Sequence, residues 1–191
     1  MTVDVKGKTA VVLIGHGAPA TDCPPQFIGE LMSLEWRDSS HAPGGVSGAA
    51  SASRSHGHGS GSVSDRAAAL DAKIRDWPRR PDNDPYKIGL ERVAAALRPM
   101  LPQGLFAIGY NEFCRPSIPE AIEQVIGQGA MRVLVIPSML TPGGIHSEVD
   151  IPRALDQMRA KYPAVLIEYI WPFDVAQVAS LLAAHIRQVL K

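Results

Sequence analysis

The chain has 191 residues, of which 46% are hydrophobic and 20% are charged, and this composition predicts a folded domain with a core of its own. Nineteen basic and nineteen acidic side chains cancel, so no overall positive charge is present to hold nucleic acid or an anionic membrane. The two cysteines form no CxxC pair, which argues against a disulfide framework and a thiolate zinc site and favours the cytoplasm. No signal-peptide pattern and no apolar run of roughly 18 residues occurs, so we expect neither secretion nor membrane insertion.

Four short apolar runs, rich in β-branched residues and without polar alternation, predict strands that are buried on both faces. They lie at residues 9–15, 105–110, 132–137 and 164–170. At least one helical pattern separates each run from the next, which is typical of a parallel sheet. We therefore expect an α/β fold, in which one domain over residues 1–191 has a four-stranded parallel sheet flanked by helices.

The expected helices carry recognisable start signals. Ser117 and Glu120 match the capping box and predict a helix over about residues 117–127. Asp150, two residues before a proline, predicts the start of the next helix. The other helices are expected after Pro24, over 65–76, over 85–99 and from Asp174 onward.

The last of these helices has an apolar face at helical spacing. The face comprises Val175, Val178, Leu182 and Val189. His185 falls at the same spacing, and we expect it to be a partly buried core histidine rather than an interface residue.

Residues 38–64 interrupt the helical pattern. Ser, Gly and Ala dominate this stretch and no hydrophobic pattern is present, which predicts a flexible insertion. It carries His41, His56 and His58. Two interpretations stay open: a tolerated surface loop with incidental histidines, which we favour, and a segment that captures a divalent ion near the active site.

The first predicted strand runs into Gly15-His16-Gly17, and this segment matches the dinucleotide pattern G-x-G-x-x-A. A dinucleotide fold requires another strand with a carboxylate about 20 residues later, and none is predicted there. A histidine phosphatase would need an arginine where Gly15 stands. No G-x-S-x-G elbow and no phosphate-binding GxxxxGK[ST] loop occurs either, so a hydrolase and a P-loop NTPase lose their best support.

Two histidines and one carboxylate follow predicted strands. His16 follows the first strand, Glu112 the second and His146 the third. Because open α/β sheets bind ligands at the carboxyl ends of their strands, we expect both imidazoles to face one crevice as a functional pair. Glu112 alone is equally consistent with a base, a metal ligand or a helix cap. Cys114 is more typical of small core filling than of a thiolate ligand.

Three segments together resemble a known family. They are GHGAP at 15–19, NEFCRPSIPEAI at 111–122 and VLVIPSMLTPGGIHSEVDIP at 133–152. The combination resembles the sirohydrochlorin chelatases of the CbiX type, relatives of ferrochelatase. By position, the resemblance places the family's metal-binding, catalytic histidines on His16 and His146 and its acidic residue on Glu112. Ala18 departs from the pattern, since many members have Ser there.

The resemblance implies insertion of a divalent metal, as substrate, into a sirohydrochlorin-like tetrapyrrole without an organic cofactor. Neutral imidazoles suit Co²⁺, Fe²⁺ and Ni²⁺, two histidines leave coordination positions open for transfer, and Glu112 is placed to accept pyrrole protons. Apolar residues that we expect to line the ring slot are Met139, Leu140, Pro142 and Ile145. Arg115 and Arg153 are expected to bind the ring carboxylates. The ordinary alternatives are core packing for the apolar residues and exposure to solvent for the arginines.

A second class of function uses the same histidine pair. A non-enzymatic carrier would bind the divalent metal through His16 and His146 and pass it to a partner, but it would have no need of a tetrapyrrole-sized cleft. The resemblance also implies a homodimer, because ferrochelatase-like chains hold two homologous halves and this chain has one set of motifs.

Overall fold

The computed structural model describes residues 8–39 and 63–190, which form two compact units. Residues 19–84 contribute a helical unit, and the remaining described residues contribute a sheet unit. The insertion expected at 38–64 is shortened at both ends, because one helix extends to Ser39 and the next begins at Val63. Its interior, which carries His41, His56 and His58, lies outside the described residues.

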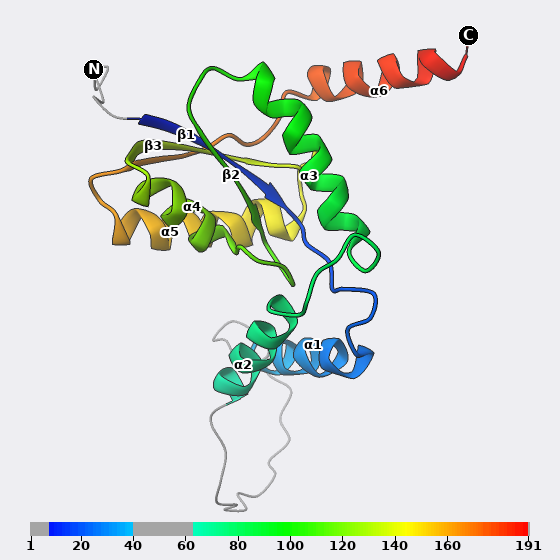
Figure 1. Ribbon diagram of the computed structural model, residues 1–191, viewed down its shortest axis with the longest axis vertical. Coiled ribbons are helices and arrows are strands. Elements are labelled where there is room, and N and C mark those ends of the chain that lie inside the picture. The colour runs from blue at the N-terminus through cyan, green and yellow to red at the C-terminus, as the bar shows by residue number, and fades with distance from the viewer. Residues whose placement is uncertain (1–7, 40–62, 191) are drawn as a thin grey trace, which may run out of the picture. The chain divides into compact units, whose positions relative to one another are not determined.

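The sheet unit contains a four-stranded sheet with strand order β2-β1-β3-β4, and all its neighbouring strands are parallel (Figure 1). The strands are β1 (Lys8–Gly15), β2 (Leu105–Tyr110), β3 (Ala130–Pro137) and β4 (Leu166–Tyr169). This confirms the predicted fold class and all four strands. β4 is shorter than the apolar run that predicted it, since it pairs only with residues 132–135 of β3.

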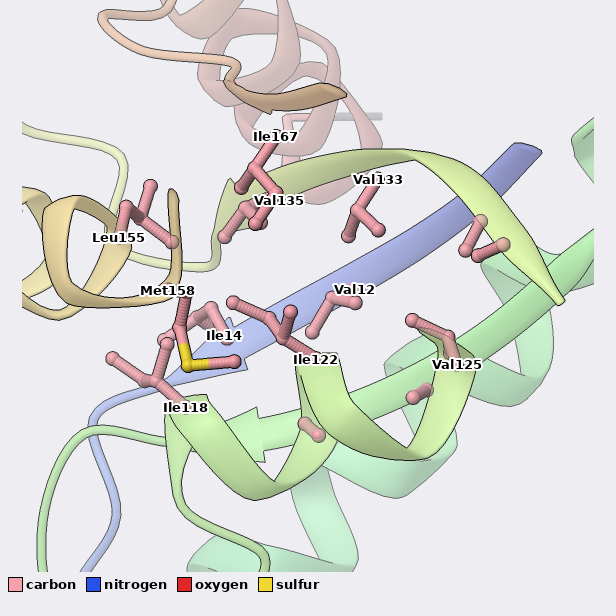
Figure 2. Packing of buried hydrophobic residues seen from close by; sticks show 14 of the residues in the cluster. Val12, Ile14, Ile118, Ile122, Val125, Val133, Val135, Leu155, Met158 and Ile167 are labelled. Atoms are coloured by element: carbon pink, nitrogen blue, oxygen red, sulfur yellow. The ribbon is translucent and has the colours of Figure 1, made fainter. Parts of the chain in front are cut away.

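Helices α4 (Ile118–Gly127) and α5 (Ile151–Lys161) pack against one face of the sheet. The predicted capping box is present at the start of α4. Figure 2 shows Val12 of β1 next to Ile122 of α4, and Leu155 of α5 belongs to the same cluster. All three side chains are fully buried, and burial of each contributes about 1.5–3 kcal/mol. The sheet face covered by α4 and α5 is therefore a rigid support for the loops at the ends of the strands.

The other face carries α3 (Pro85–Leu97), which is followed by a short 3₁₀ turn, η1 (Arg98–Met100). Leu90 and Ala94 of α3 pack with Leu13 of β1 and Tyr110 of β2.

The last helix, α6 (Val175–Val189), begins as predicted, because the Asp174 carboxylate accepts a hydrogen bond from the backbone N–H of Ala176. No residue of α6 is buried. Leu182 is 56% exposed and His185 is exposed too, so the expectation that His185 is a core residue is wrong. Helical spacing identified an apolar face but carried no information about what covers it.

The helical unit contains α1 (Pro25–Ser39) and α2 (Val63–Arg75), and its two ends are joined by hydrogen bonds. Thr21 donates a backbone hydrogen bond to the carbonyl of Asn83 over 2.8 Å. The Asp22 carboxylate accepts from three side chains near the other end, Trp77, Arg80 and Asn83. The chain therefore enters and leaves this unit at one point.

Within the described ranges, no helix is both long enough and apolar enough to cross a membrane.

Candidate metal centre

His16, Glu112 and His146 come together at the carboxyl edge of the sheet. Their elements are neighbours, because β1 lies between β2 and β3. One ligand atom of each residue lies within 4.8 Å of those of the other two, and the two imidazole rings stand nearly perpendicular, with centroids 4.5 Å apart. The structure thus places in one cluster the three residues predicted for metal binding and catalysis.

Backbone hydrogen bonds fix Glu112 beside His16. The N–H of Asn111 donates to the carbonyl of Gly15 over 2.9 Å, and the N–H of Glu112 donates to the carbonyl of His16 over 2.8 Å. Gly17 adopts a φ of +93°, and a Cβ at this position would lie 1.9 Å from the backbone oxygen of Glu112. A glycine is therefore required at position 17, because only a residue without a Cβ lets the backbone of Glu112 come this close. This requirement is separate from the space that the glycine leaves around the imidazole of His16.

Replacing Gly17 with alanine should lower the free energy of unfolding by about 3 kcal/mol, because a positive φ costs an alanine about 1–2 kcal/mol and the backbone must also shift. Urea unfolding measures the change. Gly129→Ala is the matched control, since Gly129 has a φ of +92° but open space around its Cβ position. Equal losses in the two variants would contradict the close-approach explanation.

His16 is held by two hydrogen bonds, one at its backbone and one at its ring. Its backbone N–H donates to the hydroxyl oxygen of Tyr86 over 2.7 Å, and its Nδ1 lies 2.7 Å from the carbonyl oxygen of Gly17. A carbonyl oxygen only accepts hydrogen bonds, so the ring proton resides on Nδ1. The lone pair of Nε2 is therefore available to a metal ion.

The same tautomer follows for His146, whose Nδ1 lies 2.7 Å from a carboxylate oxygen of Asp150. A carboxylate also only accepts, which again places the proton on Nδ1 and the lone pair on Nε2. The side-chain amide nitrogen of Asn111 lies 2.9 Å from the same nitrogen, and an amide flip, which exchanges the positions of its nitrogen and oxygen, would present an acceptor to that proton.

The position of Asp150 agrees with the sequence expectation, because α5 begins directly after it and has the proline in its first turn. The side chain of Asp150, however, does not cap the helix, and the residue itself has helical dihedrals. A π-helical turn, His146–Asp150, precedes α5, so the helical segment starts earlier and Asp150 lies one turn after His146. Its carboxylate consequently bonds to the imidazole instead of the helix end.

The donor set of the cluster combines two imidazole nitrogens and one carboxylate. Such ligands are typical of first-row divalent ions such as Co²⁺, Fe²⁺ and Ni²⁺. Binding by the two imidazoles alone leaves coordination positions open, as a site that releases its ion requires, and leaves the carboxylate beside them. The His146 side chain is 23% exposed and that of Glu112 is 35% exposed, so both are accessible from solvent.

Two aromatic residues, one at the end of β4 and one just after it, support the turn that carries His146. The hydroxyl of Tyr169 donates to the carbonyl of Ser147 over 3.0 Å, and the indole N–H of Trp171 donates to the Glu148 carboxylate over 3.2 Å. Burial raises the pKa of Tyr169 to about 12, so the phenol stays protonated and remains a donor. The Tyr169 bond therefore persists over the whole physiological pH range.

The residues predicted to contact the ring have mixed surroundings. Met139 packs against the core, and Leu140 is half-buried. Pro142, Arg153 and Ile145 are exposed, Ile145 by 64%. Arg115 pairs with Glu120, the carboxylate of the α4 capping box. Their contacts with a ring remain predictions.

Cys114 is a core residue, as predicted from the sequence. It is fully buried in the cluster beneath α3, and its thiol donates to the carbonyl of Ala18 over 3.2 Å.

Removing the Asp150 carboxylate should weaken Co²⁺ binding by about 10- to 100-fold, the usual effect of losing a partner that orients a metal-binding histidine. Isothermal titration of Asp150→Ala with Co²⁺, without any tetrapyrrole, measures this change. Asp156→Ala provides a control, because Asp156 is an exposed carboxylate on α5, the helix that follows Asp150. Unchanged affinity in the Asp150 variant would show that the 2.7 Å contact does not orient His146.

Comparison with known proteins shows that parts of this chain are similar to two chelatases. A sirohydrochlorin cobaltochelatase from Priestia megaterium is 43% identical over 70 residues, which are 37% of this chain and 22% of the relative. A sirohydrochlorin ferrochelatase from the same organism is 33% identical over 66 residues, which are 35% of this chain and 24% of the relative. The matches thus span less than a quarter of either relative.

A solved structure described as a cobalamin (vitamin B12) biosynthesis CbiX protein from Marinobacter aquaeolei VT8 shares the fold. Its TM-score is 0.51 at 15% identity, and the match covers 95% of this chain and 97% of that chain. The CbiX family model matches residues 83–189, more than half of the chain, including Glu112, His146 and Asp150 though not His16. The chain therefore belongs to the CbiX family.

Proposed function

We propose that this chain is a metal chelatase that inserts Co²⁺, Fe²⁺ or Ni²⁺ into sirohydrochlorin or a closely related tetrapyrrole. The observation that carries the proposal is the cluster of His16, Glu112 and His146, whose ligand atoms lie within 4.8 Å of one another. Membership of the CbiX family supports it, as do the printed names of the relatives, a cobaltochelatase and a ferrochelatase.

In the proposed mechanism, the metal ion is a substrate held by Nε2 of His16 and Nε2 of His146. The tetrapyrrole approaches from the open coordination positions. Two ring N–H bonds break as the bonds from the ring nitrogens to the metal form, so one M²⁺ enters and two protons leave. The Glu112 carboxylate accepts these protons one at a time and passes them to water.

The proposed ring site uses Met139, Leu140 and Ile145 as apolar walls and Arg115 and Arg153 as partners for the ring carboxylates. Arg115 would have to exchange its bond to Glu120 for a substrate carboxylate. We place the reaction in the cytoplasm, without an organic cofactor.

An absorbance titration with sirohydrochlorin tests this function. We expect the protein to bind the ring without metal and to convert its spectrum to that of the metallated ring when Co²⁺, Fe²⁺ or Ni²⁺ is added, faster than the same mixture without protein. Binding of Co²⁺ with no binding of the ring would contradict the proposal and favour a metal carrier. Binding of the ring with no acceleration by any of the three metals would also contradict it.

A further inference from the structure

Trp171 follows β4 at the same edge of the sheet as the metal centre. The strand order is β2-β1-β3-β4, and the residues that follow these strands are, in that order, Glu112, His16, His146 and Trp171. Neighbouring strands lie about 4.8 Å apart, so an ion between the ends of β1 and β3 has the end of β4 about 7 Å to one side. A tetrapyrrole centred on that ion is wider than this with its carboxylate arms, so its outer part reaches the segment after β4.

A row of neighbouring side chains connects Trp171 with His146. The indole N–H of Trp171 donates to the Glu148 carboxylate over 3.2 Å. The turn that carries His146 is helical from Ile145 onward, and side chains three or four positions apart on such a turn are neighbours. Ile145 is therefore next to Glu148 and Val149. Val149 is in turn next to His146, so the two apolar side chains lie between the indole and the imidazole.

Ile145, Val149 and Trp171 form an apolar strip that is open to solvent. Ile145 is 64% exposed and Val149 is 41% exposed, and Trp171 is half-buried. Apolar side chains that are exposed side by side are typical of a surface that a ligand covers. The Glu148 carboxylate borders the strip and would repel the carboxylates of the ring. The apolar strip therefore suits the flat apolar body of a tetrapyrrole and not its acidic arms.

The indole of Trp171 is held in one orientation before any ligand arrives. The Tyr169 ring stacks on it with centroids 6.4 Å apart and planes 24° apart. The Phe173 ring packs edge to face with it, with centroids 5.5 Å apart. A side chain that is already ordered loses little conformational entropy on binding, so a contact with it contributes more to affinity.

We propose that Trp171 is a ring-binding residue, which contacts the flat body of the tetrapyrrole on the opposite side of the metal centre from Glu112. This inference rests on the proposed function and adds to it a contact with the ring. Aromatic side chains bind flat conjugated systems through stacked and edge-to-face contacts. Because the contact is with the ring, Trp171 sets the affinity for the tetrapyrrole and leaves the affinity for the metal ion unchanged.

Titration of metal-free sirohydrochlorin, followed by absorbance, tests this contact in the full chain. Trp171→Ala should raise the dissociation constant of the ring about 5- to 100-fold, as expected for the loss of one aromatic contact with a flat conjugated ligand. Trp171→Phe should stay within about threefold of the wild type, because it keeps an aromatic ring. Leu166→Ala is the matched control and should leave the dissociation constant unchanged, since Leu166 is 44% exposed at the opposite end of β4.

The affinity for Co²⁺ without the ring separates a ring contact from mere support of the turn. If the indole only supports the turn through its bond to Glu148, both Trp171→Ala and Trp171→Phe should weaken Co²⁺ binding, because both lose the indole N–H. We expect the Co²⁺ dissociation constant of both variants to stay within about threefold of the wild type, since the bond from Tyr169 to Ser147 remains. Equal losses of ring affinity and Co²⁺ affinity would overturn the proposal.

The wild-type protein separates a failure of this inference from a failure of the proposed function. If the wild type binds and metallates sirohydrochlorin while Trp171→Ala binds the ring with an unchanged dissociation constant, the ring contact of Trp171 is wrong and the function stands. If the wild type does not bind sirohydrochlorin, both are wrong. Circular dichroism confirms that each variant is folded. Should Trp171→Ala not fold, Trp171→Leu replaces it, and an unchanged ring dissociation constant in that variant overturns the contact in the same way.

Discussion

Alanine in place of either His16 or His146 should reduce the rate of metal insertion into sirohydrochlorin at least about 1,000-fold. Each histidine supplies one Nε2 lone pair to the proposed ion, and losing even a residue that merely orients such a ligand costs 10- to 100-fold. The rate is measured by following the absorbance of the ring at a fixed Co²⁺ concentration. Because both imidazoles are partly exposed at the carboxyl edge of the sheet, circular dichroism and the thermal midpoint should stay close to those of the wild type.

The two histidine variants should also lose Co²⁺ affinity in the absence of the ring. This second measurement connects the lost rate to the metal rather than to the tetrapyrrole. If a folded variant of either histidine inserts metal at the normal rate, the cluster is not the site of the reaction.

Glu112→Gln should slow insertion by about 100- to 10,000-fold, the range expected when a general base is removed. The dissociation constant of sirohydrochlorin without metal should change less than about threefold, because an amide of the same shape replaces the carboxylate. Single-turnover measurements at saturating Co²⁺ separate the chemical step from any loss of metal affinity.

Glu123→Gln is the matched control for this experiment. Glu123 is a partly exposed carboxylate on α4 that pairs with Lys161, so its removal should leave the rate unchanged. Should the Glu112 variant lose ring binding to the same extent as rate, Glu112 would be a substrate contact and not the proton acceptor.

The sheet could be predicted from sequence because its strands are buried on both faces. Runs such as residues 105–110 have no polar alternation, and the capping box at Ser117 fixed where the following helix begins. Parallel pairing then followed from the alternation of strands and helices. The placement of His16, Glu112 and His146 at one edge is a consequence of that topology.

The supporting residues of the site could not be predicted as easily. Tyr86 and Tyr169 lie 70 and 23 positions from the histidines they support, and no local pattern connects residues so far apart in sequence. Asp150 did offer a signal, because it lies four residues after His146, the spacing of neighbours on a helix. The proline that follows indicated a helix start, and α5 does begin there, but a π-helical turn precedes it and the side chain of Asp150 bonds to His146 instead of capping the helix.

The two ends of the helical unit lie side by side, and this allows the segment between them to be altered. Since Thr21 and Asn83 are hydrogen bonded to each other, the segment between them begins and ends at nearly the same place. A segment of this geometry behaves as a module: its length and content can change without stretching the strand before it or the helix after it. Variation in this part of the sequence therefore leaves the spacing of the metal-binding residues intact, and a short turn joining Thr21 to Asn83 is the natural starting point for a minimal version of the protein.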